Sequence, residues 1–291
     1  MHTGHRNDMS AWPDIRCQRG HETHETVTVD ISIGGPTAYH DYTPIPERLA
    51  RRFKMVIWDH KRYMTEGPYC PARDAVSETI RALGVWEPRE TALALQVLST
   101  APPGSVALDM GAQLGWFSLL AASCGVQSYA VEADGWNLGA LGQSMIANGW
   151  QDRWHRCGFR VTSESSAGLI SGMVASGSQP IRFVKLDLEG AEDDAVRMLW
   201  PSIEAGNVDH MLMEVSPVFA DYYPALLARI VKAGYRLYLL PPKRQPPHVL
   251  DSVPADLESF RLDSLPEAEM LETVASWHQE DVWLAREGAT W

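Results

Sequence analysis

Residues Ser105–Gly115 read SVALDMGAQLG, and this stretch decides the fold expected for the chain. Its first four residues, Ser105–Leu108, are a short apolar run of the kind that is buried on both faces of a parallel sheet. A turn is expected at Gly111–Gly115, and a helix is expected at Trp116–Cys124. In open α/β sheets, ligands bind at the carboxyl ends of the strands, which is where this glycine turn would lie.

Expected strands and helices alternate on both sides of that turn. A helix at Glu90–Leu98 precedes it. The segments that follow are a strand at Gln127–Val131, a helix at Leu138–Asn148, a strand at Ile181–Leu186, a helix at Ala191–Leu199, a strand at Met211–Val215, a helix at Tyr222–Ala233, and strands at Tyr235–Leu240 and Val282–Ala285. Such alternation predicts an α/β fold built from βαβ units around a largely parallel sheet.

The chain divides into three expected parts. Residues 1–26 are polar and predict a flexible tail, and residues 27–85 predict a cap or lid beside the core. In that region, Arg48–Trp58 fits either a helix or a strand, and Val76–Leu83 predicts a helix that ends at Gly84. Residues 86–291 form the expected ligand-binding domain, with an insertion rich in proline and acids at residues 241–281.

Composition excludes several classes of protein. The 291 residues carry 25 Lys and Arg against 37 Asp and Glu, a formal net charge of −12. An acidic chain repels phosphate backbones, so no nucleic-acid partner is expected. The four scattered cysteines form no C-x-x-C pair, which fits a reducing, cytoplasmic environment. Without an apolar leader or an apolar run of membrane-spanning length, no membrane partner is expected, while a homodimer stays open.

The glycine turn argues against two kinds of nucleotide site. The dinucleotide fingerprint needs glycines at its first, third and sixth positions, where this chain has Gly111, Gln113 and Trp116. A P-loop pattern is also missing from the sequence. The turn therefore suits a ligand without phosphates, and Asp109 at the strand tip would suit an ammonium or a sulfonium.

Glu132 ends the second expected strand of the domain. An acid in this position can accept hydrogen bonds from both hydroxyls of a ribose. The simpler alternative is a solvated acid beside a helix N-cap.

A second motif, Lys185–Glu192 (KLDLEGAE), joins a strand end to a helix start. Acids favour a helix N-terminus through the macrodipole, and the acids at Glu192–Asp194 are expected to do only that. Asp187 and Glu189 precede the helix and are expected to point toward the crevice.

With these motifs, the sequence resembles the FkbM family of S-adenosylmethionine-dependent methyltransferases. The resemblance covers about residues 86–240 and Leu284–Arg286, and it rests on Leu108–Gly115, on Val131–Glu132 with Asn137 and Asn148, and most specifically on Lys185–Glu192. Two positions depart from the family pattern, which usually has Asn in place of Gln113 and Pro in place of Ala133.

The resemblance implies a class I methyltransferase fold, a Rossmann-like and mostly parallel seven-stranded sheet with helices on both faces. It also implies S-adenosylmethionine as methyl donor and transfer to an oxygen of a small-molecule acceptor. Glu132 would hold the ribose, Asp187 would lie near the donor amine or the reacting centre, and Gly158–Thr162 would approach the adenine. The full set of implied donor-binding residues is Asp109, Gly111, Ala112, Gly115, Glu132, Asn137 and Asp187.

A protonated hydroxyl is a poor nucleophile, so such an acceptor needs a general base or a metal. The candidate bases are Asp187, Glu189 and Glu214. Asp187 and Glu214 are expected on adjacent strand ends, where they could also bind Mg²⁺. A carboxylate acceptor would need neither base nor metal.

Several alternatives stay open at this stage. The acceptor atom could be a nitrogen or a carboxylate oxygen, and the domain could bind the donor without catalysis. A nicotinamide oxidoreductase is a further alternative, against which Gln113 and Trp116 count. Trp58, Tyr63, Tyr69 and Trp86 fit an acceptor pocket as well as a cap core; His40, His60 and His248 could reach an acceptor but fit the surface better, and His210 is expected before its strand, in the core or at the surface.

Overall fold

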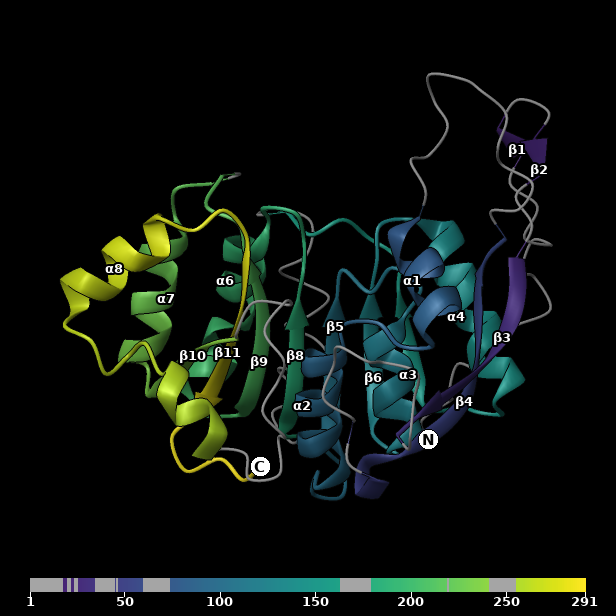
Figure 1. The fold of residues 1–291 in the computed structure, drawn as a ribbon, viewed down its shortest axis with the longest axis horizontal. Coiled ribbons are helices and arrows are strands. Elements are labelled where there is room, and N and C mark those ends of the chain that lie inside the picture. Colours follow the sequence, from purple (N-terminus) through teal and green to yellow (C-terminus); the bar gives the residue numbers. More distant parts are fainter. Residues whose placement is uncertain are drawn as a thin grey trace, which may run out of the picture.

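The computed structural model describes residues 18–19, 22–23, 26–34, 45, 47–59, 74–162, 179–218, 220–240 and 255–291. Its centre is a seven-stranded sheet in the order β10-β11-β9-β8-β5-β6-β7 (Figure 1). The strands are β5 (Val106–Met110), β6 (Gln127–Val131), β7 (Trp154–Cys157), β8 (Ile181–Leu186), β9 (Val208–Val215), β10 (Tyr235–Leu239) and β11 (Glu280–Arg286). The five strands from β7 to β9 run parallel, and β11 is antiparallel to both β9 and β10.

This arrangement is the class I methyltransferase fold, so the expected fold is confirmed. The chain enters the sheet at β5, moves outward to β6 and β7, and then crosses back to β8 on the other side of β5. Ligands of open α/β sheets bind where the strand order reverses in this way, beyond the carboxyl ends of the strands. The order therefore places the candidate site at the ends of β5, β6 and β8.

Helices cover both faces of the sheet and bury two hydrophobic clusters. One face carries α2 (Pro88–Ser99), α3 (Trp116–Ser123) and α4 (Gly135–Ala147). The other face carries α6 (Glu192–Glu204), α7 (Tyr223–Lys232) and α8 (Glu267–Ala275). Every residue of β5 and β8 is buried between the two layers, including the charged residues Asp109 of β5 and Arg182 and Lys185 of β8.

Three elements differ from the sequence-based expectation. The strand β9 begins at Val208, so His210 lies inside the strand and not before it as expected. The helix α6 continues past Leu199 to Glu204 and includes Pro201, because buried residues such as Ile203 extend its apolar face. The strand β7, the helix α8 and the 3-10 helix η5 (Ala255–Phe260) were not anticipated, since short or polar segments carry little periodic signal.

The described residues before the sheet include an antiparallel pair of strands, β3 (Thr26–Ile33) and β4 (Arg51–Trp58). The short 3-10 helix η2 (Glu47–Leu49) lies between them in the chain and directly precedes β4. The ambiguous segment Arg48–Trp58 is thus mainly a strand. The free edge of β4 is capped by side chains: the backbone N–H groups of Lys54, Val56 and Trp58 donate to Asn148 Oδ1, Ser144 Oγ and Ser77 Oγ, respectively. These side chains provide hydrogen-bond acceptors for the backbone N–H groups of every second residue, so no further strand is needed there. The bonds to Asn148 and Ser144 also fix the strand pair against α4.

The strand pair shares a hydrophobic cluster with α3 and α4, and Phe53 packs edge-on against Trp116. The helix α1 (Ala75–Leu83) ends at Gly84 as expected, whose φ of 72° and N–H bond to Ile80 O close the helix. Figure 1 shows α1 beside the upper ends of the sheet strands. Within the expected tail, β1 (Gln18–Arg19) and β2 (Glu22–Thr23) form a short antiparallel pair.

Some expectations fall on residues outside the described part of the chain. These residues are His40, His60, Tyr63, Tyr69 and His248, together with most of the expected tail and residues 241–254 of the expected insertion. Within the described ranges, every helix is too short or too polar to cross a bilayer.

Candidate active site at the strand ends

Backbone hydrogen bonds bring four strand ends together at one edge of the sheet. The loop after β5 donates to β6 from Gly111 N and Ala112 N, both to Val131 O, at 2.9 and 3.0 Å. Glu132 N donates to Cys157 O at 3.1 Å, and Asp187 N donates to Met110 O at 3.1 Å. The structure thus gathers the two sequence motifs and Glu132 in one place, as expected from strands that end together.

The carboxylate of Glu132 is fixed by two backbone groups. Its Oε2 accepts from Gln113 N at 2.8 Å, and its Oε1 accepts from Asp134 N at 2.7 Å. The residue is only half-buried, and each carboxylate oxygen has a second lone pair for a further donor. Glu132 can therefore accept two hydroxyl groups, as ribose binding requires.

The two glycines of the turn serve close packing. A Cβ at Gly111 would lie 1.7 Å from the carbonyl oxygen of Asp187, and a Cβ at Gly115 would lie 2.3 Å from Leu141 Cδ1. Both residues also have a left-handed backbone, with φ of 82° and 81°. Only glycine fits there, so Gly111 is what lets the loops after β5 and β8 touch. Ala112 between them is buried.

Asp109 lies below this turn and not on an open surface, being only 3% exposed. Its Oδ2 accepts from Ser118 N at 2.8 Å and from Ser118 Oγ at 2.7 Å. Burial raises the pKa of Asp109 to about 6, an effect that the bonds from Ser118 and the charge of Lys185 oppose. Asp109 thus holds the first turn of α3 in place, and a contact with the donor stays a prediction.

Aromatic residues near the site mostly pack in the core. Trp116 is buried, and its Nε1 donates to Thr91 Oγ1 at 2.7 Å, so it is not a stacking surface for a ligand. Trp58 and Trp86 are partly buried against the same cluster. Trp58 Nε1 also donates to Asn137 Oδ1 at 3.3 Å, which ties β4 to the predicted donor-binding residue Asn137.

Asp187 belongs to a group of ion-paired side chains that is largely buried. Lys185 Nζ lies 3.2 Å from Asp187 Oδ2 and 3.6 Å from Glu87 Oε2. Lys185 and Glu87 are almost fully buried, whereas the side chain of Asp187 is 26% exposed. The sequence did not reveal the ion pair of Glu87 with Lys185, because an acid just before a helix is usually explained by its favourable interaction with the helix macrodipole.

Glu214 is the penultimate residue of β9, whose end lies beside the end of β8, and Asp187 directly follows β8. Its Oε1 accepts from Ser216 Oγ at 3.0 Å and from Gln279 Nε2 at 2.6 Å. Burial and the charge of Asp187 raise the pKa of Glu214 to about 7, and Lys185 opposes the shift. A carboxyl group with this pKa can exchange a proton near neutral pH, as a general base must.

The other two acids of the second motif differ in position. Glu189 is exposed, and its pKa is raised by partial loss of solvent and by the charges of Asp187 and Glu192. Glu192 is buried and does more than favour the helix dipole, which corrects the expectation for it. Its carboxylate accepts four hydrogen bonds, from Leu188 N, Gly190 N, Tyr222 Oη and Tyr223 Oη.

Backbone strain is concentrated at the same edge. Glu87, Gln113 and Glu189 have φ values of 42°, 47° and 52°, and among described residues other than glycine they alone have positive φ. Each such residue costs of order 1–3 kcal/mol and persists only where surrounding contacts hold it. Their shared location at the ends of β5 and β8 and at the start of α2 supports a functional site there.

The described side chains do not form a metal-binding group at this edge. Among the described residues, no group of three or more His, Cys, Asp or Glu side chains could hold an ion. Asp187 and Glu214 lie on adjacent strand ends as expected, but two carboxylates are too few ligands for Mg²⁺.

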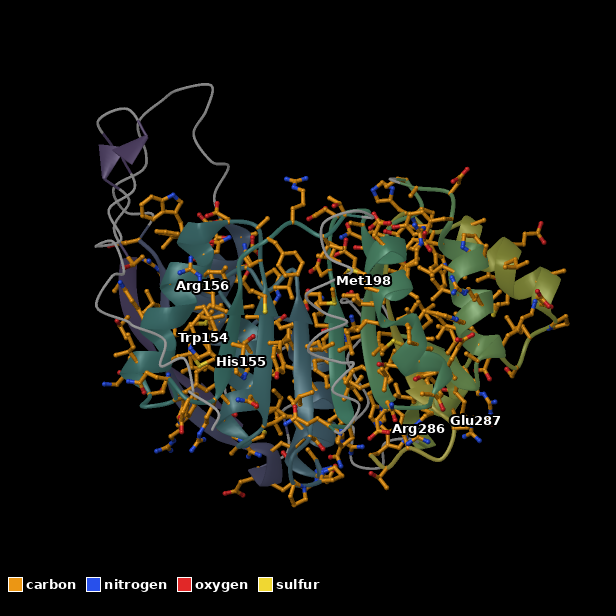
Figure 2. The ribbon with its side chains drawn as sticks, turned by 180° about the vertical axis from the view of Figure 1, so that it is seen from behind. Trp154, His155, Arg156, Met198, Arg286 and Glu287 are labelled. Carbon is orange, nitrogen blue, oxygen red and sulfur yellow. The ribbon has the colours of Figure 1, made fainter. Side chains whose placement is uncertain are left out.

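His210 belongs to the opposite edge of the sheet. It is fully buried, its Nε2 bonds to Thr290 O at 2.8 Å, and its Nδ1 accepts from Trp283 Nε1 at 3.2 Å. Figure 2 shows Arg286 and Glu287 at this edge, at the end of the antiparallel β11. His210 is therefore a core residue, which was one of the two roles expected for it.

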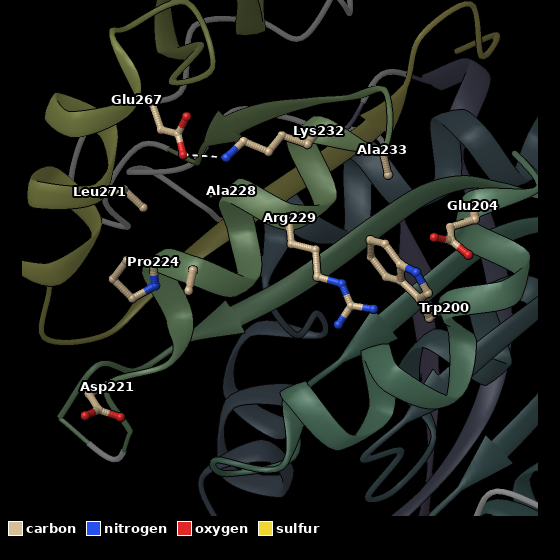
Figure 3. Close-up of a pocket in the computed structure, with 11 residues that line it drawn as sticks. Trp200, Glu204, Asp221, Pro224, Ala228, Arg229, Lys232, Ala233, Glu267 and Leu271 are labelled. Atoms are coloured by element: carbon tan, nitrogen blue, oxygen red, sulfur yellow. Dashed lines mark hydrogen bonds and ion pairs between the residues drawn. The ribbon is translucent and has the colours of Figure 1, made fainter.

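A groove of about 650 Å³ lies elsewhere, on the outer side of α6, α7 and α8 (Figure 3). The guanidinium of Arg229 lies 3.5 Å from the ring centre of Trp200, and Lys232 pairs with Glu267 at 2.6 Å. None of the predicted site residues lines this groove. Hydrogen bonds, charge and backbone strain distinguish the strand-end site from this groove.

Comparisons with known proteins return structural likeness only. No known family model matches the chain, and no curated protein matches it in sequence. The METTL16 methyltransferase domain is 12% identical over 68% of this chain and 68% of its own, with a TM-score of 0.43. An rRNA methylase from Streptococcus thermophilus is 13% identical over 69% of this chain and 99% of its own, with a TM-score of 0.41. A precorrin-6y C5,15-methyltransferase from Geobacter metallireducens is 13% identical over 54% of this chain and 75% of its own, with a TM-score of 0.38. With so few shared residues, these likenesses concern the arrangement of helices and strands alone.

Proposed function

We propose that this protein is an S-adenosylmethionine-dependent methyltransferase of the FkbM type that methylates a hydroxyl group of a small-molecule acceptor. The observation that carries the proposal is the carboxylate of Glu132, held by the turn at Gln113 and still able to accept two hydroxyls. The turn has no glycine pattern for a pyrophosphate, so a nucleoside without phosphates fits it better than a dinucleotide.

The charges at the strand ends also suit this donor. The buried cation Lys185 lies among four acidic side chains, those of Glu87, Asp187, Glu214 and Asp281. Burial raises the pKa of Glu87 to about 8 and that of Glu214 to about 7, so both groups would gain from a further cation nearby. S-adenosylmethionine carries a sulfonium and an ammonium, so an excess of carboxylates favours its binding. In this proposal, Glu132 binds the ribose and Asp187 binds the amine of the donor.

The bound donor would supply a methyl group activated by its positive sulfur. The protein then has to align the acceptor oxygen with that carbon, exclude water, and remove the hydroxyl proton. Glu214 is the proposed base, because its pKa of about 7 lets it be deprotonated at neutral pH and still take up a proton. Asp187 and Glu189 are the alternative bases, and Asp187 would then act at the reacting centre.

A small molecule is the proposed acceptor, and a net charge of −12 supports this choice over a nucleic acid. The test is a screen with donor carrying a labelled methyl group against acceptors with hydroxyl, amine and carboxylate groups. The proposal expects label transfer to a hydroxyl, with turnover nearly abolished in Asp187→Asn. Transfer to an amine or a carboxylate would reject the acceptor class, and donor binding without turnover on any acceptor would favour a non-catalytic domain.

A further inference from the structure

Resting on the proposed donor site, we propose that Lys185 is a positioning residue for Asp187, with Glu87 holding Lys185 in place as its second ion-pair partner. Lys185 lies in the middle of the sheet near the end of β8, and Glu87 precedes the first turn of α2. Neither residue belongs to the predicted donor or catalytic set, so the proposal adds two residues to the machinery of the site.

The burial of Lys185 demands an explanation. The residue is 2% exposed, and its Nζ has no well-formed hydrogen bond within the described part of the chain. It is instead within ion-pair distance of two carboxylates and lies 5.3 Å from the ring centre of Phe117. A buried ion pair stabilises a fold little compared with apolar side chains of similar volume. An ammonium kept in this position is therefore better explained by the charge that it orients.

Glu87, the second ion-pair partner of the ammonium, is buried in a similar way. It is 8% exposed, its Oε2 accepts no hydrogen bond from any described group, and its backbone has a φ of 42°. The Thr91 N–H bond to Glu87 O, at 2.8 Å, begins the helix from this strained residue. Burial raises the pKa of Glu87 to about 8, and the charge of Lys185 opposes this shift, so the ammonium favours the ionised form of Glu87. The chain thus accepts local strain and a buried acid beside Lys185.

Of the three ion-paired residues Glu87, Lys185 and Asp187, Asp187 is the one that reaches the candidate site. The exposed fraction of the side chain rises from 3% for Lys185 and 7% for Glu87 to 26% for Asp187. The backbone of Asp187 is already fixed by its N–H bond to Met110 O and by close contact with Gly111. Lys185 then fixes the remaining freedom, the rotation of the carboxylate, so that the free oxygen faces the donor amine.

The charged groups around Lys185 come from four elements. Glu87 precedes α2, Asp187 follows β8, Glu214 is the penultimate residue of β9, and Asp281 lies opposite Glu214 on β11. Asp187 is the member nearest to the ammonium among the ion pairs that Lys185 forms. Loss of the ammonium would therefore disturb Asp187 first.

The experiment measures S-adenosylhomocysteine affinity by calorimetry for wild type, Lys185→Met, Asp187→Asn and the double variant. We expect Asp187→Asn to weaken binding about ten-fold or more, as for loss of a charge-assisted hydrogen bond. Lys185→Met should lose nearly as much, and the double variant should be no weaker than Asp187→Asn. Lys185→Arg, which keeps the cation, should recover part of the loss, whereas Lys54→Met on the exposed face of β4 should bind like wild type.

Three outcomes would overturn the proposal while leaving the donor site intact. They are wild-type affinity in Lys185→Met, losses that multiply in the double variant, and no recovery in Lys185→Arg. Unchanged affinity in Asp187→Asn would also overturn it. If wild type itself does not bind S-adenosylhomocysteine, the donor site is rejected first. If Lys185→Met fails to fold, the same comparison is made in Glu87→Gln/Lys185→Met, where neither buried charge is left unpaired.

Discussion

The backbone N–H of Gln113 donates to Oε2 of Glu132 at 2.8 Å, so the glycine turn itself holds the carboxylate that would bind a ribose. Gln113 adopts a left-handed backbone with a φ of 47° to make this bond. Its side chain reaches the other way, and Nε2 donates to Asp74 Oδ1 at 2.9 Å. One strained residue thus joins the candidate site to the start of α1.

Replacing Glu132 tests the ribose site directly. Glu132→Ala should weaken S-adenosylhomocysteine binding by more than about ten-fold, because two hydroxyl donors lose a charged acceptor. Calorimetry at fixed pH checks this, with Glu269→Ala at an exposed position of α8 as the matched control. Equal affinities of Glu132→Ala and Glu269→Ala would remove Glu132 from the donor site.

Replacing Asp74 tests the link between α1 and the site. Its Oδ2 caps α1 by accepting from Ser77 N at 2.9 Å, and its Oδ1 accepts from Gln113. Asp74→Ala should cost roughly 0.5–2 kcal/mol in the free energy of unfolding and should speed amide exchange within α1. Asp74→Asn keeps an acceptor for the cap and should be milder. Unchanged exchange in Asp74→Ala would mean that α1 is held by its apolar contacts alone.

Glu192 is expected to stabilise the fold, not to bind the donor. Glu192→Ala removes four hydrogen bonds at a buried carboxylate and should lower the free energy of unfolding by about 3 kcal/mol or more. Urea unfolding measures the change, and the exposed Glu204→Ala on the same helix should stay within about 0.5 kcal/mol of wild type. A similarly small loss in Glu192→Ala would show that the loop and the two tyrosines hold without it.

His210 gives the stability a dependence on pH. Burial lowers the pKa of His210 to about 4, so the folded protein keeps this ring neutral where an unfolded histidine, with a pKa of about 6.5, already binds a proton. Above about pH 6.5, the neutral His210 ring does not lower the free energy of unfolding. As the pH falls from 6.5 toward 4, the unfolded state binds a proton that the folded state does not, and the free energy of unfolding falls by about 3 kcal/mol in all.

His210→Phe isolates this effect, because the buried carboxyl groups of Asp109 and Glu214 titrate in both proteins. The unfolding free energy of wild type minus that of His210→Phe should fall between pH 6.5 and 4. A constant difference over this range would mean that the ring is accessible to protons in the folded state.

Local signals in the sequence account for much of this site. The stretch from Asp109 to Gly115 predicted a strand end and a tight turn, and the structure has both, since a short apolar run and glycines act over neighbouring residues. Glu132 and Asp187 were also placed correctly at strand ends, because parallel strands in alternating βαβ units end at one edge.

Contacts between distant residues account for what the sequence did not reveal. The roles of Glu87 and Lys185 depend on an ion pair across two elements, and the role of Glu192 depends on Tyr222 and Tyr223 of α7. No periodic pattern marks such pairs, because each residue alone looks like an ordinary charged or aromatic side chain. His210 was placed before its strand because the polar start of β9, Val208–His210, resembles a loop.

The most direct test of the account is a crystal structure of the protein with S-adenosylhomocysteine. The account predicts ribose hydroxyls within hydrogen-bond distance of Glu132 and the amino group of the ligand beside Asp187. Ligand density in the groove of Figure 3, near Trp200 and Arg229, with none at the strand ends would contradict it.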